Sequence, residues 1–144
     1  LAAIIALIHD VIITIGIFAF LSYEVNLSIV AAVLTIVGYS MNDTVVIFDR
    51  IRENLRKYSK IPISDISNIS TNETLSRTLI TSVTTLLALS SIYVFGGEIL
   101  KGFSFAMIIG VIVGTYSSIF VATPILNYTK VNQQTILKED IENN

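Results

Sequence analysis

The stretch GYSMNDTVVIFDRIREN, residues 38–54, places the carboxylate of Asp43 inside an apolar run that ends in a block of acids and arginines. The run extends from Leu27 to Phe48, about the length that a helix needs to cross ~30 Å of hydrocarbon. An ionisable group at such a position is costly unless it is paired or hydrated, and it usually serves a function. The stretch therefore predicts both a transmembrane helix and a candidate functional residue.

The composition points to the same class of protein. Of the 144 residues, 53% are hydrophobic and only 14% are charged, which excludes an ordinary soluble domain and is typical of a membrane protein. The sequence has no cysteine, which excludes disulfides and thiolate metal sites. It shows no nucleophile triad, phosphate-binding loop or cluster of metal ligands. We therefore expect no enzyme activity, no cofactor, no metal and no nucleic-acid partner.

Four apolar runs predict an all-α membrane protein with four transmembrane helices. Two short turns, around 22–26 and 96–102, imply that neighbouring helices are antiparallel. The helices would form a bundle over residues 1–128, followed by a polar cytoplasmic tail over residues 129–144. Their expected ranges are about 1–22, 27–49, 72–96 and 102–127.

The longer connection, about 50–70, is expected to lie as an amphipathic helix along the inner membrane surface until Pro62 breaks it. Ser70 and Glu73 fit a capping box that begins the third helix, which would place Arg77 in the first two turns of that helix. Lysine and arginine are concentrated in this connection and after the last helix. The positive-inside rule therefore puts both ends of the chain in the cytoplasm.

Arg77 is the expected partner of Asp43. Counted from the outer ends of their helices, Asp43 lies about 16 residues or ~24 Å deep, and Arg77 lies about 19 residues or ~28 Å deep. Two alternatives stay open: a permanent ion pair that only fixes helix register, and an arginine that only reaches the inner headgroups. The candidate proton-coupling residues are Asp43, Arg77 and Asn42. A polar stripe above Arg77, expected to face the bundle interior, consists of Thr81, Thr84, Ala88 and Ser91.

A possible secondary polar site lies near the inner end of the first helix, where His9 and Asp10 are adjacent. They either anchor and cap that end of the bundle or transfer protons. Ser40 and Thr81 complete this candidate site. The fourth helix contributes small residues at every fourth position, which allows close approach of another helix; these residues are Ala106, Gly110, Gly114 and Ser118.

Three strings, GYSMNDTVVIFDRIREN, LSRTLITSVTTL and FGGEILKGFSFAMIIGVIVGTYSSI, cover much of residues 7–123. In sequence and order they resemble the C-terminal membrane half of the SecD/SecF family, the protein-export membrane proteins of the bacterial Sec machinery. The string NDTVVIFDRIRE favours the SecF branch, because the SecD branch typically carries a DANVLIFERIRE-like string there.

The resemblance implies part of a bundle like that of the resistance-nodulation-division superfamily, whose first helices and periplasmic domain would precede Leu1. It implies a multi-pass protein of the bacterial inner membrane that associates with SecD, the SecYEG channel and its auxiliary proteins, preproteins and membrane lipids. The implied activity is late preprotein translocation driven by the proton-motive force, coupled through Asp43 and Arg77; His9 and Asp10 match an HD pair of the family. Two other functions stay open, a structural scaffold for Sec complex assembly and a small-molecule or lipid exporter of the same fold.

Overall fold

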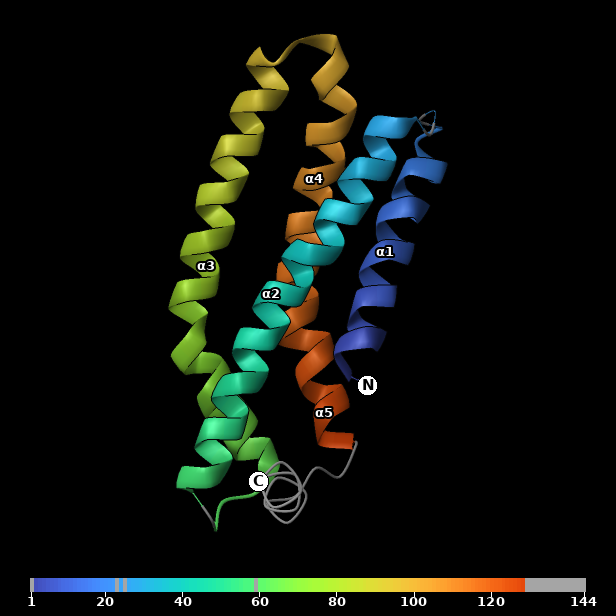
Figure 1. Ribbon diagram of the computed structural model, residues 1–144. Coiled ribbons are helices and arrows are strands. Elements are labelled where there is room, and N and C mark those ends of the chain that lie inside the picture. Colours follow the sequence, from blue (N-terminus) through green and yellow to red (C-terminus); the bar gives the residue numbers. More distant parts are fainter. Residues whose placement is uncertain (1, 23, 25, 59, 129–144) are drawn as a thin grey trace, which may run out of the picture.

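The computed structural model describes residues 2–22, 24, 26–58 and 60–128. Four long helices run alternately up and down (Figure 1). Each is long and apolar enough to cross a membrane, which confirms the predicted all-α membrane fold. The expected tail lies outside the described residues. The helices are α1 (Ala2–Phe20), α2 (Leu27–Lys57), α3 (Ile63–Phe95) and α4 (Gly97–Ser117), and α4 continues through η1 (Ser118–Ala122) into α5 (Thr123–Tyr128).

The connection between α2 and α3 differs from the prediction. The helix α2 continues through the charged block to Lys57, and α3 begins directly after Pro62, so the expected surface helix over 50–70 does not exist as a separate element. Proline suits a helix start, because the first turn has N–H groups without helical acceptors in any case. We use the name charged end for the end of the bundle that contains the last turns of α2, up to Lys57, and the first turns of α3, from Ile63.

The predicted capping box is wrong, because Ser70 and Glu73 lie inside α3. Their side chains instead accept hydrogen bonds from Asn54 on α2, so they join two helices rather than begin one. Arg77 consequently lies about four turns into α3 and not in its first two turns. With 33 residues, α3 is about 50 Å long, which exceeds the hydrocarbon thickness and extends the helix beyond it at the charged end.

The turn between α3 and α4 is shorter than the predicted 96–102. Gly96 alone separates the two helices, and Gly97 has the left-handed φ of 76° that favours glycine. A Cβ on Gly96 would lie 2.4 Å from the carbonyl oxygen of Ile92. Both glycines are therefore needed for so abrupt a reversal of the chain.

The central helix is α4, which contacts α1, α2 and α3. A Cβ on Gly110 would lie 2.2 Å from Cδ1 of Ile36, and a Cβ on Gly114 would lie 3.2 Å from Cβ of Ser40. The expectation that the small residues of α4 allow close helix approach is therefore confirmed, and the neighbour is α2. The four residues are all buried, namely Ala106, Gly110, Gly114 and Ser118.

A π-helical segment, η1, interrupts the regular hydrogen bonding between α4 and α5. Pro124 follows two residues later and explains the interruption: it has no N–H to donate to the carbonyl of Phe120, and its ring crowds that carbonyl. Ser118, the first residue of η1, is buried against α2, where its hydroxyl lies 3.0 Å from that of Thr44.

Two apolar clusters fill the interior, and a polar layer separates them. The cluster away from the charged end includes Ile36 of α2, and the cluster at the charged end includes Ile47 and Ile51. The buried positions of α2 between these clusters are Ser40, Asp43 and Thr44. The candidate functional residues of α2 therefore lie at the level where the core changes from apolar to polar.

Candidate functional site

Three contacts fix the register of the antiparallel helices α2 and α3. From one contact to the next, the residue number rises on α2 and falls on α3. Asp43 lies between the first two contacts and is therefore at the level of Thr78 and Arg77. The contacts are Tyr39 Oη to Ser82 Oγ at 3.5 Å, Arg50 Nε to Glu73 Oε2 at 2.7 Å and Asn54 Nδ2 to Ser70 Oγ at 2.9 Å.

Asp43 is buried, with 5% of its surface exposed, and its Oδ2 atom has no hydrogen-bond partner among the described residues. Thr78, at the same level on α3, is also buried and its hydroxyl is likewise unpartnered there. Leaving such an atom unsatisfied costs about 1–3 kcal/mol, so buried polar groups are rarely left this way. The carboxylate thus lies in surroundings where taking up a proton or a water molecule would relieve an unfavourable state.

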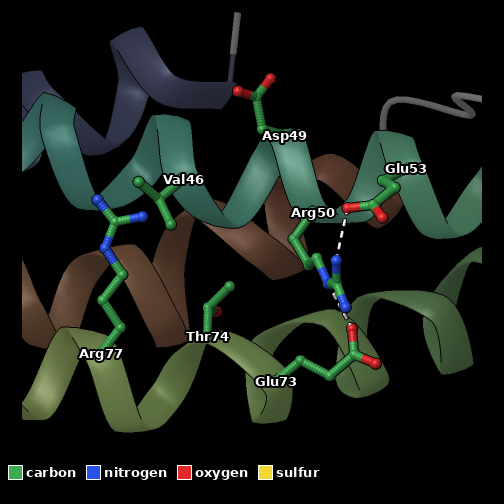
Figure 2. Close-up of a pocket in the computed structure, with 7 residues that line it drawn as sticks. All are labelled: Val46, Asp49, Arg50, Glu53, Glu73, Thr74 and Arg77. Atoms are coloured by element: carbon green, nitrogen blue, oxygen red, sulfur yellow. Dashed lines mark hydrogen bonds and ion pairs between the residues drawn. The ribbon is translucent and has the colours of Figure 1, made fainter.

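Arg77 lies on the exposed side of α3, near enough for its charge to act on Asp43. Within the described part of the chain, no ion pair or hydrogen bond joins the guanidinium to this or any other carboxylate. Figure 2 shows the Arg77 side chain extending from α3 toward Val46, which lies one turn beyond Asp43 on α2. The structure brings the two predicted residues to one level without pairing them.

A cavity of about 340 Å³ opens between α2 and α3 on the side of Arg77 that faces the charged end (Figure 2). Its lining is mainly charged, so it is a place that water can fill. Arg77 stands at one side of this cavity, and the lining residues are Val46, Asp49, Arg50, Glu53, Glu73, Thr74 and Arg77.

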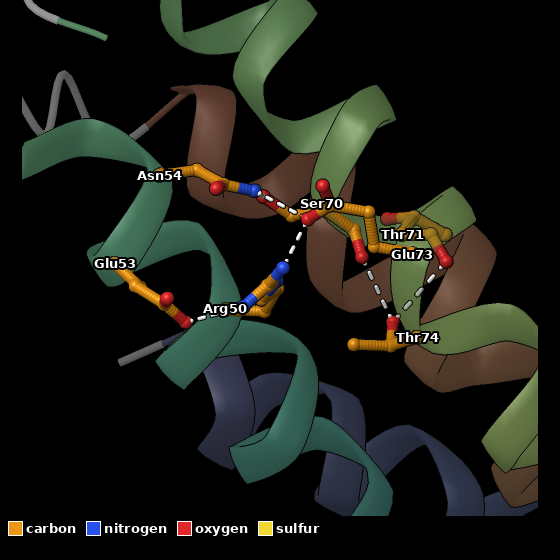
Figure 3. A network of polar contacts seen from close by, with 7 residues as sticks. All are labelled: Arg50, Glu53, Asn54, Ser70, Thr71, Glu73 and Thr74. Atoms are coloured by element: carbon orange, nitrogen blue, oxygen red, sulfur yellow. Dashed lines mark hydrogen bonds and ion pairs between the residues drawn. The ribbon is translucent and has the colours of Figure 1, made fainter. Parts of the chain in front are cut away.

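A polar network joins α2 to α3 beside this cavity (Figure 3). Glu73 Oε2 accepts hydrogen bonds from Arg50 Nε at 2.7 Å and from Asn54 Nδ2 at 2.8 Å. Arg50 also pairs with Glu53 on its own helix. Asn54 is only 1% exposed and also donates to Ser70. Sequence reasoning missed this network, although a signal was present: Asn54 shares the periodic apolar face of the charged end of α2 and needs partners there.

The secondary site is assembled from α1 and α2. Asp10 is fully buried and accepts a hydrogen bond from Ser40 Oγ at 2.5 Å, while His9 Nδ1 lies 3.1 Å from the other carboxylate oxygen. The expected inclusion of Thr81 is wrong. Thr81 lies on α3, which packs on α2 and α4, and its hydroxyl donates to the carbonyl of Arg77 in its own helix.

The polar stripe above Arg77 does not face the interior of this chain. Thr81 is half-buried, and the other members, Thr84, Ala88 and Ser91, are exposed. Contacts such as Glu73 to Asn54 set the rotation of α3 and turn a different side inward. Asn42 is also exposed, on another side of α2 from Asp43. The inward side of α3 in this region consists of Thr74, Thr78, Ser82 and Leu89.

Comparisons with known proteins agree on one family. Residues 1–132 match the family described as protein export membrane protein SecD/SecF, C-terminal. The chain is 54% identical over 133 residues to the protein translocase subunit SecF of Cereibacter sphaeroides, which covers 92% of this chain and 41% of that protein. It is 59% identical over 122 residues to SecF of Rickettsia rickettsii, covering 85% of this chain and 40% of that protein.

Two solved structures are similar over nearly the whole chain. The crystal structure of SecDF in a super-membrane-facing form has a TM-score of 0.86 and 42% identity, covering 98% of this chain and 19% of that one. The crystal structure of SecDF from Thermus thermophilus, described as a translocon-associated membrane protein, has a TM-score of 0.86 and 45% identity. The match covers 90% of this chain and 18% of that one. The chain spans about two fifths of the length of the SecF relatives named above. It belongs to the SecD/SecF family of protein-export membrane proteins and contains the C-terminal membrane domain of that family.

Proposed function

We propose that this chain is the membrane half of a SecF-type subunit that pairs with SecD and uses the proton-motive force to drive late preprotein translocation. It would act as a transport component rather than as an enzyme, in contact with the SecYEG channel, its auxiliary proteins and lipids of the bacterial inner membrane. The observation that carries the proposal is the buried carboxylate of Asp43, which has an unsatisfied oxygen and an arginine nearby that does not pair with it.

The coupling follows from two opposing effects on Asp43. Burial favours the neutral carboxyl, whereas the positive charge of Arg77 favours the carboxylate. A small change in the distance between the two groups therefore shifts the protonation of Asp43, and protonation in turn biases the helix arrangement. Moving one charge through 100 mV provides about 2.3 kcal/mol, which biases a two-state equilibrium roughly fiftyfold.

A partner such as SecD is supported by the surroundings of Arg77. Although Arg77 borders the cavity between α2 and α3, it is exposed in this chain, and so is Thr84 two turns along the same helix. An arginine facing hydrocarbon at this depth is costly, so protein or water must cover it. A membrane-embedded SecD would provide such a cover and close the site around Asp43.

The proposed orientation rests on the charged end of the bundle. Arg52, Arg56, Lys57 and Lys60 gather there, at the end of α2 that lies on the same side as the start of α1 (Figure 1). Basic residues near a membrane end are retained in the cytoplasm. We therefore place both ends of the chain on the cytoplasmic side.

Four variants test the coupling, each made in the full subunit expressed together with SecD: Asp43→Asn, Arg77→Met, Arg77→Lys and the double change Asp43→Asn with Arg77→Met. We expect Asp43→Asn to leave the complex assembled but to abolish the proton-driven part of export, because asparagine cannot ionise. Arg77→Lys should be less damaging than Arg77→Met, since lysine keeps a point charge. The double variant should remain inactive.

The scaffold alternative gives the opposite pattern in the same assay. If Asp43 and Arg77 only hold the helices together, each single change should lower the amount of complex, because it leaves one charge unpaired. The double change should then restore both the complex and export. Full export by the double variant would overturn the proposed function.

A further inference from the structure

We infer that Arg50 and Asn54 are positioning residues for Arg77: by binding Glu73 they prevent this acid from capturing Arg77, and so leave the guanidinium available to Asp43. The inference rests on the proposed function, because it concerns how the proposed proton switch stays free to operate. The polar network between α2 and α3 would then do more than hold the two helices together, because it would also keep Glu73 away from Arg77.

Glu73 is the natural competitor for Arg77. The two residues are four positions apart on α3, and an acid that precedes a base by four residues is in the favourable order for an ion pair along a helix. In the described structure no such pair forms; Glu73 Oε2 accepts from Arg50 and Asn54 instead. In Figure 2 the Glu73 side chain points toward Arg50, whereas the Arg77 side chain points toward Val46.

The two groups that donate to Glu73 both belong to α2, and each has a further partner. Asn54 is buried, and its Nδ2 donates both to Glu73 at 2.8 Å and to Ser70 at 2.9 Å, which uses both amide hydrogens. Arg50 is held from its other side by Glu53, three residues along the same helix. Glu73 thus accepts from two donors of α2, each of which has a second partner.

Release of Glu73 would change the charge around the proposed switch. The cavity of about 340 Å³ is lined by both Glu73 and Arg77, so the acid has room to turn toward the base. The other charged groups on this side come from α2, namely Asp49, Glu53 and Arg50. A Glu73–Arg77 pair would neutralise the charge that favours ionised Asp43, and the carboxyl would then stay protonated through the cycle.

The test compares Arg50→Gln, Glu73→Gln and the double change Arg50→Gln with Glu73→Gln, in the full subunit with SecD. The measurement is the proton-driven component of preprotein export and its dependence on pH, with the amount of complex as a control. Arg50→Gln should reduce this component at least fivefold and shift its pH midpoint. Glu73→Gln alone, and the double variant, should stay within about twofold of the unmodified subunit. Arg50→Lys, which unlike Arg50→Gln keeps a positive charge to pair with Glu73, should retain most of the activity.

If the network only holds α2 and α3 together, the expected pattern differs, because removing Arg50 or Glu73 breaks the same contact. If Glu73→Gln is as damaging as Arg50→Gln, or if the double variant is no better than Arg50→Gln, the positioning inference is overturned. Asp43→Asn, measured in parallel, separates the two proposals. Normal proton-driven export by Asp43→Asn would overturn the proposed function and this inference with it, whereas its loss leaves the Arg50 and Glu73 comparison to decide the positioning role alone.

Discussion

Asp10 and Asp43 are both buried carboxylates, yet their partners suit them to different roles. Asp10 receives the hydroxyl of Ser40 on one oxygen and lies beside His9 on the other. Asp43 keeps one oxygen without any described partner. A satisfied buried carboxylate holds helices together, whereas an unsatisfied one gains from a change of protonation or hydration. We therefore expect Asp10 to matter for stability and Asp43 for coupling.

The role of Asp10 can be tested by Ser40→Ala. The change leaves a buried carboxylate oxygen without its donor and should cost about 1–3 kcal/mol of stability. Thermal unfolding of the purified complex should show the loss, while proton-driven export per assembled complex should be unchanged. Loss of coupling at a normal amount of stable complex would instead place Asp10 on the proton path.

A second prediction at this scale concerns Thr78, whose buried hydroxyl has no described partner at the level of Asp43. Thr78→Val keeps the shape and removes the unsatisfied group, so the stability of the complex should be equal or higher, by up to about 1–3 kcal/mol. Thermal unfolding measures this effect. Reduced stability would show that the hydroxyl has a partner in the assembled complex.

At the scale of helices, the contact between α4 and α2 makes the sharpest prediction. A Cβ on Gly110 would meet three side-chain atoms of Ile36 at 2.9 Å or less, and Ile36 is itself buried. Gly110→Leu should therefore force α2 and α4 apart and reduce the amount of assembled complex recovered from membranes. Gly114→Leu should do the same, because its Cβ would lie 3.2 Å from Ser40.

The matched control is Gly38→Ala, because a Cβ at Gly38 would have no atom within 4 Å. This change should leave packing intact and stabilise α2 by up to about 1 kcal/mol through helix propensity. Equal recovery of the Gly110→Leu and Gly38→Ala complexes would contradict the close packing of α4 on α2.

The helices themselves were predictable from the sequence, but their rotation was not. Apolar length reveals a membrane-spanning run such as Leu27–Phe48, and counting along helices places Asp43 and Arg77 at one depth. In a membrane protein, however, the lipid-facing and core-facing sides of a helix can both be apolar, so periodicity does not show which side is buried. Ser70 and Glu73 fit a local capping pattern, and only their contacts with Asn54 show their actual use. The competition for Arg77 depends on that contact between helices and was hidden for the same reason.

At the scale of the whole molecule, the proposed orientation can be tested directly. The sequence has no cysteine, so Lys60→Cys and Glu98→Cys each introduce one reactive group into this part of the protein. Both positions are exposed, at opposite ends of the bundle. A membrane-impermeant thiol reagent should label Lys60→Cys from the cytoplasmic side and Glu98→Cys from the periplasmic side. The reverse pattern would contradict the positive-inside assignment.

The last prediction concerns the side of α3 that carries Arg77. Thr84 lies on the same side of α3. Its hydroxyl donates to the carbonyl of Ile80 in the same helix, so it is tolerated without a partner from another helix. The charged guanidinium of Arg77 is not satisfied by a carbonyl of its own helix in this way, so a protein surface or water has to cover this side. Val83, by contrast, is 53% exposed on an apolar side of the same helix, where lipid is a suitable neighbour.

Thr84→Trp and Val83→Trp therefore form a matched pair. If SecD packs on the Arg77 side, tryptophan at Thr84 should clash with it and reduce the amount of SecD that co-purifies with the subunit, because overpacking a close contact typically costs about 1–3 kcal/mol. Tryptophan at Val83 should leave recovery unchanged, since lipid chains adjust to the added volume. Reduced recovery for Val83→Trp with normal recovery for Thr84→Trp would place SecD on the apolar side instead, and water alone would then have to cover Arg77.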